Sequence, residues 1–237
     1  MHPLRLTAAA LVVSALSGAA AATDKVSGDR YTFTSPNGVI EACVALAKVP
    51  GGVYSGQDLA DEKALCGIDI YDQKVAVCPK LRSTSPGTFV YQITRGPYAS
   101  DQKGFEAEVC PRGDVVVKEA DGPPANFKVT MNAEGTSGTF STASLLYYHY
   151  ARYLDASIHV PVSVYRSIDR KVHEQRVTRR GLELSAGKKS LRMNHAAWQE
   201  LDAVEKRPEA YPETDELFTA DRKRIYGVLQ HVRGKRY

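Results

Sequence analysis

Short runs of alternating apolar and polar residues dominate the first half of the chain, and such runs are typical of strands with one buried face. Clusters of Gly, Pro and Asn between these runs indicate turns. The runs predict strands at 31–35, 68–71, 74–77, 88–94, 105–109 and 114–120. Residues 39–49 instead have apolar positions at helical spacing, followed by Pro50 and Gly51, and they predict a helix.

The second half contains longer segments with helical spacing. It begins after residues 121–124, whose two prolines follow a glycine and favour an extended connector. The predicted elements are strands at 126–132 and 224–232, an extended segment at 158–166, and helices at 142–155, 168–180 and 194–206. Pro161 predicts an edge position for the extended segment, because proline has no N–H to donate to a neighbouring strand.

Each predicted helix has its own boundary or face signals. In the helix at 168–180, Ser167 is the expected N-cap and Gly181 the expected end. The faces predicted to be buried consist of Ala143, Leu146, Tyr150 and Leu154 in the first helix and of Ala197, Leu201 and Val204 in the last.

Together these elements predict an α+β fold, with an antiparallel, β-rich, disulfide-pinned N-terminal half and a mixed helix–strand C-terminal half. We expect a β-rich, disulfide-containing domain over 23–122 and a basic α+β domain over 123–237. Hydrophobic residues make up 43% and charged residues 24% of the 237 residues, which excludes a disordered or collagen-like chain.

Residues 1–22 have the three parts of a secretory signal peptide. Arg5 gives a positive start, an apolar run extends to Leu16, and alanines at 20–22 form a small-residue cleavage site. The apolar run is shorter than the ~20 residues that a membrane-spanning helix needs. The sequence therefore predicts cleavage near Thr23, no transmembrane segment afterwards, and a periplasmic or secreted protein.

Four cysteines remain after the predicted cleavage, namely Cys43, Cys66, Cys78 and Cys110. An even number in an oxidising compartment predicts two disulfides. Their wide spacing disfavours a zinc site, which is usually built from close pairs, so no metal is expected. Three pairings fit the sequence, and a bridge across a hairpin between Cys66 and Cys78 is one feasible choice.

Positive charge is concentrated in the second half, although the whole chain carries a formal charge of only +4. Residues 166–192 contain nine basic residues: Arg166, Arg170, Lys171, Arg176, Arg179, Arg180, Lys188, Lys189 and Arg192. The first six are the candidate anion-binding residues, and a solvated helix face is the simpler explanation for them. An anionic ligand or a protein partner is expected, and export disfavours nucleic acid.

Familiar catalytic signatures are missing. The sequence has no nucleophile elbow, HExxH motif, Walker loop or dinucleotide glycine fingerprint. The glycine loop at 134–140 is better explained as a turn than as a phosphate cradle. Five histidines occur singly in different predicted elements, as packed or surface imidazoles do: His149, His159, His173, His195 and His231. We therefore assign no catalytic residue and expect no cofactor.

Four tyrosines lie within two turns of the helix at 142–155: Tyr147, Tyr148, Tyr150 and Tyr153. They cover more of the helix circumference than one buried face requires. Burial is the simplest explanation, and Tyr150 is assigned to the core. The alternative is a helix covered on several sides, or a platform for a sugar or a base.

A strand with Lys128, the helix core Tyr148–His149–Tyr150 with Arg152, and the pair Val160–Pro161 follow one another here. This order resembles the amino-terminal lobe of atypical protein kinases, namely the secretory-pathway Golgi casein kinase-like and HipA-like families. The resemblance implies that Lys128 contacts the phosphates of ATP bound with a divalent metal. Ser144 stands where these families have a helix glutamate.

The leading functional hypothesis is an exported, non-catalytic binding or accessory protein that engages an anionic partner through its basic face. The alternative is a kinase-like domain or fragment that binds nucleotide through Lys128. The basic, strand-like end of the chain fits either a natural terminus or a truncated reading frame. In the second case, the missing carboxyl-terminal portion could hold the active site. A polysaccharide hydrolase is a third hypothesis, but no pair of carboxylates has a selective spacing. The sequence does not define an oligomeric state.

Overall fold

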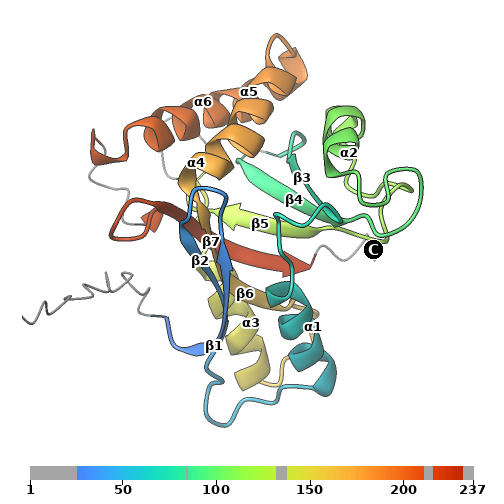
Figure 1. The fold of residues 1–237 in the computed structure, drawn as a ribbon. Helices are drawn as coiled ribbons and strands as arrows, with labels where there is room; N and C mark the ends of the chain where they lie inside the picture. Colours follow the sequence, from blue (N-terminus) through green and yellow to red (C-terminus); the bar gives the residue numbers. More distant parts are fainter. Residues whose placement is uncertain (1–25, 84, 132–137, 211–215, 232–237) are drawn as a thin grey trace, which may run out of the picture.

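A computed structural model describes residues 26–83, 85–131, 138–210 and 216–231 of the chain. The predicted signal peptide lies outside these residues, as does most of the glycine loop at 134–140. A single seven-stranded sheet in the order β1-β2-β6-β7-β5-β4-β3 forms the centre of the molecule (Figure 1). All its neighbouring strands are antiparallel. The strands are β1 (Gly28–Thr34), β2 (Ile40–Leu46), β3 (Val75–Pro79), β4 (Gly87–Gln92), β5 (Ala125–Val129), β6 (Ser163–Asp169) and β7 (Arg224–His231).

Helices lie above and below this sheet in Figure 1. The longer ones are α1 (Gly56–Cys66), α2 (Gln102–Glu108), α3 (Ala143–Tyr153), α4 (Arg170–His173), α5 (Arg179–Ser185) and α6 (Arg192–Lys206). A π-helical segment, η2 (Glu174–Thr178), joins α4 to α5, and short 3₁₀ turns are η1 (Cys110–Arg112), η3 (Lys189–Leu191) and η4 (Pro208–Ala210). The predicted α+β class, with a β-rich, disulfide-containing N-terminal half and a mixed C-terminal half, is confirmed.

The three strands of the second half, β6, β7 and β5, lie together at the centre of the sheet, between the first-half pairs β1–β2 and β4–β3. β2 pairs with β6, and β4 pairs with β5. The predicted division between 23–122 and 123–237 therefore does not coincide with a division of the sheet.

Hydrophobic clusters pack against both faces of the sheet, because successive side chains of each strand point to opposite faces. On one face, Phe127 and Val164 join the same cluster as Leu65 of α1 and Trp198 of α6. On the other face, α2 packs Phe105 against the β3–β4 end of the sheet, while α3 contributes Leu145 to a smaller cluster over β2, β6 and β7. This arrangement leaves each helix with one buried side.

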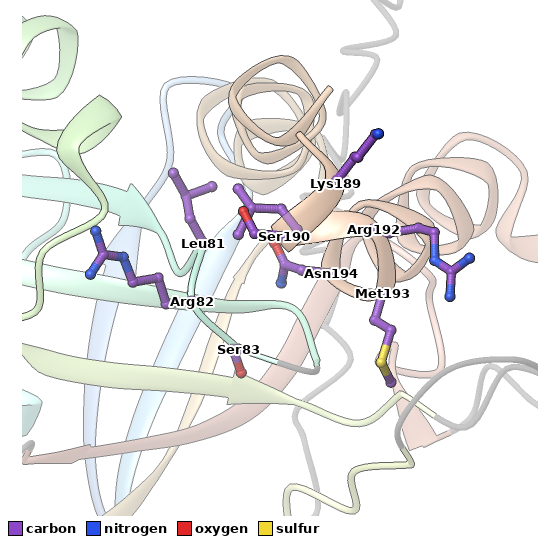
Figure 2. Close-up of a pocket in the computed structure, with 9 residues that line it drawn as sticks. Leu81, Arg82, Ser83, Lys189, Ser190, Arg192, Met193 and Asn194 are labelled. Atoms are coloured by element: carbon purple, nitrogen blue, oxygen red, sulfur yellow. The ribbon is translucent and has the colours of Figure 1, made fainter. Parts of the chain in front are cut away.

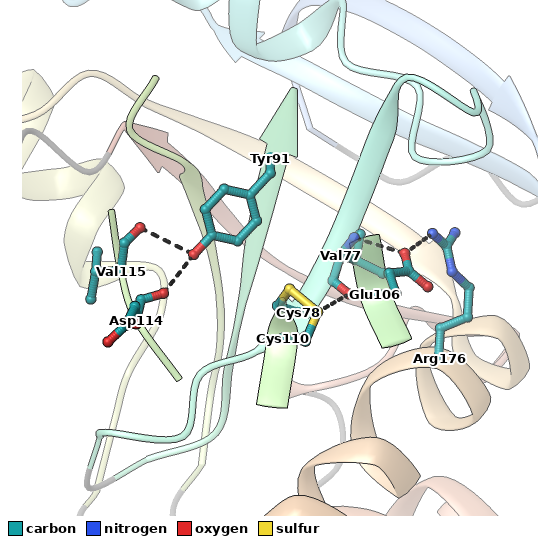
Figure 3. Close-up of a disulfide and its surroundings, with 8 residues drawn as sticks. All are labelled: Val77, Cys78, Tyr91, Glu106, Cys110, Asp114, Val115 and Arg176. Carbon is teal, nitrogen blue, oxygen red and sulfur yellow. Dashed lines mark hydrogen bonds and ion pairs between the residues drawn. A yellow bond between two sulfur atoms is a disulfide. The ribbon is translucent and has the colours of Figure 1, made fainter. Parts of the chain in front are cut away.

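Both disulfides are present, with Cys43 bonded to Cys66 and Cys78 bonded to Cys110. The feasible Cys66–Cys78 bridge is therefore wrong, because each of these cysteines bonds across the fold and not within one hairpin. Cys43–Cys66 ties α1 to β2, and Cys78–Cys110 ties β3 to the turn after α2 (Figure 3). Each cross-link joins a helical segment to the sheet.

Several predicted strands are confirmed, at 31–35, 74–77, 88–94, 126–132 and 224–232. Residues 158–166 lead into β6, but the predicted edge position is wrong, since β6 lies between β2 and β7. Pro161 precedes the strand and so needs no ladder partner. Three other strand predictions, at 68–71, 105–109 and 114–120, are also wrong: α2 occupies most of the second, and turns occupy the others.

The helix predicted at 39–49 is wrong as well, because Ile40–Leu46 forms β2. This strand lies between β1 and β6 and is buried on both faces, so its apolar residues do not alternate. Helix α1 was not predicted, since few of its residues are apolar. Its N terminus is nevertheless well defined, because Ser55 and Asp58 form a reciprocal capping box.

The helices of the second half are found close to their predicted places, with three differences. Asp169, not Ser167, caps α4, and the helical segment continues through Gly181 to Ser185. Gly181 packs against the indole ring of Trp198, where an added Cβ would lie 2.6 Å from the ring. The buried face of α6 is confirmed, but the buried face predicted for α3 is wrong. Leu145, Tyr148, His149 and Ala151 are buried there, and Leu146, Tyr150 and Leu154 are exposed.

Candidate anion-binding pocket

Most of the six predicted anion-binding residues already form hydrogen bonds or ion pairs within the protein. Arg170 donates to the carbonyls of Arg222 and Glu205. Three arginines form ion pairs: Arg176 with Glu106, Arg179 with Glu174 and Arg180 with Glu183. Lys171 is exposed, whereas Arg166 is 1% exposed and lies inside the fold. The region around Arg166–Arg180 is therefore largely neutralised by its own carboxylates.

The buried Arg166 belongs to a charged cluster on β2 and β6. Its Nη2 lies 3.4 Å from Oε2 of Glu41, and its guanidinium lies 4.0 Å from the centre of the Phe33 ring. Glu41 also accepts hydrogen bonds from the Tyr71 hydroxyl and from the backbone N–H of Asp169. Burial raises the pKa of the Glu41 carboxyl, and Arg166 and these two donors oppose that rise. The two charged groups themselves, on Glu41 and Arg166, are shielded from solvent, and Phe33 and Tyr71 around them are partly buried.

A pocket of about 700 Å³ lies where the β3–β4 connection meets the start of α6 (Figure 2). This is a volume typical of small-molecule sites. We call it the basic pocket. Its walls are formed by Leu81, Arg82 and Ser83 on one side and by Lys189, Ser190, Leu191, Arg192, Met193 and Asn194 on the other.

Three cationic side chains belong to the lining of this basic pocket. In Figure 2 their charged ends point outward, Arg82 on one side and Lys189 and Arg192 on the other, with Leu81, Ser190 and Asn194 between them. No carboxylate is among the described lining residues. Within the part of the chain that the structure describes, these cations form one ion pair, between Arg82 and Asp114 at 4.0 Å. Both of its side chains are more than half exposed, so it neutralises little charge.

The two walls of the basic pocket are joined by Asn194. Its Nδ2 donates to the carbonyl of Lys80 at 3.3 Å, and its Oδ1 accepts from Nε1 of Trp198 at 2.9 Å. The N-cap residue of α6, Leu191, supplies no capping hydrogen bond. The positive end of the 15-residue helix dipole therefore adds to the charge of the cations.

Lys128 lies elsewhere, on β5, with its side chain partly buried. Burial lowers the pKa of Lys128, and burial together with Lys128 lowers the pKa of Lys80. Helix α3 carries no carboxylate that would pair with Lys128, as the sequence indicated from Ser144. The structure thus brings Lys128 close to a second lysine, and no ion pair of Lys128 is found among the described residues.

A second pocket, of about 320 Å³, is lined by residues of β3, α2, η1, η2 and α5, among them Glu106, Arg176 and Arg180. Glu106 lies 2.6 Å from Arg176 and also accepts from the backbone N–H of Val77 (Figure 3). Since a carboxylate neutralises its cation, this pocket is a poorer anion site than the basic pocket.

None of the six predicted anion-binding residues lines the basic pocket. Lys189 and Arg192 belong to the wider basic run at 166–192, whereas Arg82, Ser83 and Ser190 were not singled out from the sequence. A basic residue in the turn between two predicted strands was the available clue to Arg82. Within the described residues, no group of His, Cys, Asp and Glu side chains has the arrangement of a metal site, and no helix has the length and apolarity to cross a membrane.

Comparison of the chain with family models, with curated proteins and with solved structures finds no match. The fold and the basic pocket therefore carry the functional argument.

Proposed function

We propose that this is a non-catalytic binding protein that takes up an anionic ligand in the basic pocket. The observation that supports the proposal is a cavity of about 700 Å³ lined by Arg82, Lys189 and Arg192, without a carboxylate among its described lining residues. Cations gathered around a concave site attract anions over a distance of about a Debye length, roughly 8–10 Å at physiological salt.

The lining also favours an anion that carries an apolar portion. Leu81, Leu191 and Met193 contribute apolar side chains to the same cavity, and Met193 is half exposed. An exposed methionine adapts to ligands of different shape. We therefore propose an organic phosphate, sulfate or carboxylate with an aliphatic or aromatic body as the ligand class.

We further propose that the protein functions outside the cytoplasm, in the periplasm or as a secreted protein. Two disulfides support this proposal, because such bonds persist in oxidising compartments. The signal pattern of residues 1–22 supports it as well. Amino-terminal sequencing of the protein from its native host should begin near Thr23, and thiol labelling should find no free cysteine. A chain that retains Met1 or carries four free thiols would contradict this location.

Decyl phosphate, used below its micelle concentration, has both of the proposed ligand features. Isothermal titration calorimetry should show binding that weakens steeply as sodium chloride is added. Inorganic phosphate and decanol, which each have one of the two features, should bind more weakly. If all three bind equally, or none binds at low salt, the proposed ligand class is wrong.

Variants of the three lining cations test whether decyl phosphate binds in the basic pocket. Each exposed cation should contribute about 1 kcal/mol toward an anionic ligand, so Arg192→Ala should weaken decyl phosphate binding about fivefold. The triple variant at Arg82, Lys189 and Arg192 should weaken it on the order of a hundredfold. The matched control is Arg207→Ala, which removes the same charge from an exposed residue just after the other end of α6. Equal losses in the control and in Arg192→Ala would show that only net charge matters.

The same measurements separate this proposal from nucleotide binding through Lys128. If ATP with Mg²⁺ raises the melting temperature, and Lys128→Ala but not Arg192→Ala removes that rise, the nucleotide hypothesis is favoured. For decyl phosphate, the basic-pocket proposal predicts that Arg192→Ala weakens binding and that Lys128→Ala does not.

A further inference from the structure

The outward face of α3 is an uncharged apolar stripe. It consists of Leu146, Tyr147, Tyr150, Tyr153 and Leu154, whose exposed fractions run from 51% to 68%. At about 100° per residue, these five positions fall within an arc of about 120° along the whole helix. We call them the α3 stripe. The helix lies at the periphery of the molecule, away from α4, α5 and α6 (Figure 1).

The opposite side of α3 is held firmly against α1 and the loop before it. Arg152 makes two hydrogen bonds to the carboxylate of Asp58, at 2.7 and 2.9 Å. Tyr148 donates to Glu62 at 2.9 Å, and Nδ1 of His149 lies 2.7 Å from the Tyr54 hydroxyl. These partners fix the rotation of the helix, so the α3 stripe cannot turn toward the core.

The exposed apolar area of the α3 stripe is larger than that of single, scattered surface residues. A fully exposed aromatic side chain presents roughly 150–250 Å². Three tyrosines and two leucines that are at least half exposed therefore leave on the order of 500 Å² of side-chain surface in solvent. This reaches the range of the largest apolar patches on typical monomers, which commonly mark interaction sites.

The order of residues in the stripe is symmetric about Tyr150. Leu146 and Leu154 each lie four residues from it, and Tyr147 and Tyr153 each lie three residues from it. If two α3 helices pack antiparallel with Tyr150 on a two-fold axis, leucine meets leucine and tyrosine meets tyrosine. Such a patch is complementary to itself, which is the requirement of a two-fold dimer interface.

We propose that a second copy of this chain covers the α3 stripe, with the two α3 helices antiparallel across a two-fold axis at Tyr150. The two stripes together would bury roughly 1,000 Å², which is near the lower limit of specific interfaces. This size predicts a dimer that dissociates in the micromolar range. An anionic membrane surface fits less well, because the one basic residue of α3, Arg152, is paired with Asp58, and Asp155 beyond the stripe is exposed.

A charge placed on the proposed axis tests this arrangement. Tyr150→Glu and Tyr150→Lys should each be monomeric in sedimentation equilibrium at concentrations where the unmodified protein is a dimer, because like charges meet across the axis. A one-to-one mixture of the two variants should restore the dimer, because opposite charges then meet. Val116→Glu, at an exposed apolar residue far from α3 in sequence, is the matched control and should dimerise normally.

At concentrations well below the dimer dissociation constant, circular dichroism should show the same melting temperature for the unmodified protein and for all of these variants, since Tyr150 is exposed and the comparison is then between monomers. A monomeric unmodified protein throughout the micromolar range would overturn the proposal. So would a dimer that Tyr150→Glu leaves intact, or a mixture of Glu and Lys variants that stays monomeric. Substitutions in the basic pocket should not change the result, so this test is independent of ligand binding.

Discussion

The buried pair of Glu41 and Arg166 offers the sharpest test of how this fold is stabilised. Both side chains are almost fully excluded from solvent, and Nε and Nη1 of Arg166 have no hydrogen-bond partner among the described residues. We consider three changes: Glu41→Met, Arg166→Met, and the double variant that carries both substitutions. The first two remove one charge and leave the other buried, whereas the third removes both.

The magnitude follows from the separation of the charges. At 3.4 Å and an effective dielectric constant of about 20, the attraction is about 5 kcal/mol, most of which offsets the cost of burying both ions. Each single change should therefore lower the free energy of unfolding by roughly 3–5 kcal/mol. The double change should cost much less than the sum, because no uncompensated charge remains.

Urea denaturation at neutral pH measures these free energies, and the two single changes and the double change complete a thermodynamic cycle. Arg166→Met has an additional signature, since loss of the guanidinium raises the pKa of Glu41 further above its ordinary value. The folded state then binds a proton more tightly than the unfolded state, so the stability of this variant should fall as pH rises from about 4.5. Additive losses, or single losses below about 1 kcal/mol, would refute this account of the pair.

Three further results are expected. Replacing Cys78 and Cys110 by serine opens a 32-residue loop, which should lower the free energy of unfolding by roughly 4 kcal/mol by the loop-closure relation. Calorimetry should then show a melting temperature about 10 °C lower, and an unchanged melting temperature would contradict this. Burial and the nearby Lys48 lower the pKa of His149 to about 4, below its ordinary value of 6.5, so on the order of 2 kcal/mol of stability should be lost as pH falls from about 6.5 toward 4. The variant His149→Gln should flatten that part of the urea-midpoint profile. Gly181→Ala forces a Cβ against the neighbouring indole ring and should cost roughly 1–3 kcal/mol, whereas Gly56→Ala, with open space around it, should not destabilise the fold.

Helix α6 was predicted well because polar residues mark its exposed face at helical spacing. Strand β4 is as buried as β2, but its aromatic and β-branched residues follow a turn signal at 85–87 and identify it as a strand. Strand β2 was mistaken for a helix because both of its faces are buried, so no polar position reveals a period of two. Helix α1 was missed for the opposite reason, since its buried side includes Asp58 and Glu62, whose ion pairs with Arg152 and Lys48 replace apolar contacts.

Prediction of the basic pocket from the sequence was limited in a similar way. The run at 166–192 identified a positively charged region, but local sequence alone could not separate paired from unpaired cations there. The partner of Arg176 is Glu106, 70 residues earlier in the chain, and the basic pocket needs Arg82 from a still more distant hairpin. Such contacts depend on the order of strands in the sheet, which no local pattern determines.

Helix α3 is the most instructive error, because its position was predicted correctly and its orientation was not. Its apolar residues occupy two faces, and periodicity cannot decide which of them meets the core. The buried face contains His149 and Arg152 beside Tyr148. These side chains bond to Tyr54, Asp58 and Glu62, although Nε2 of His149 has no hydrogen-bond partner among the described residues. The more uniformly apolar face is therefore left in solvent. A helix that buries its polar groups and exposes its tyrosines is most simply explained if its outer face is also an interface, which makes the failed assignment of Tyr150 to the core an argument for the proposed dimer.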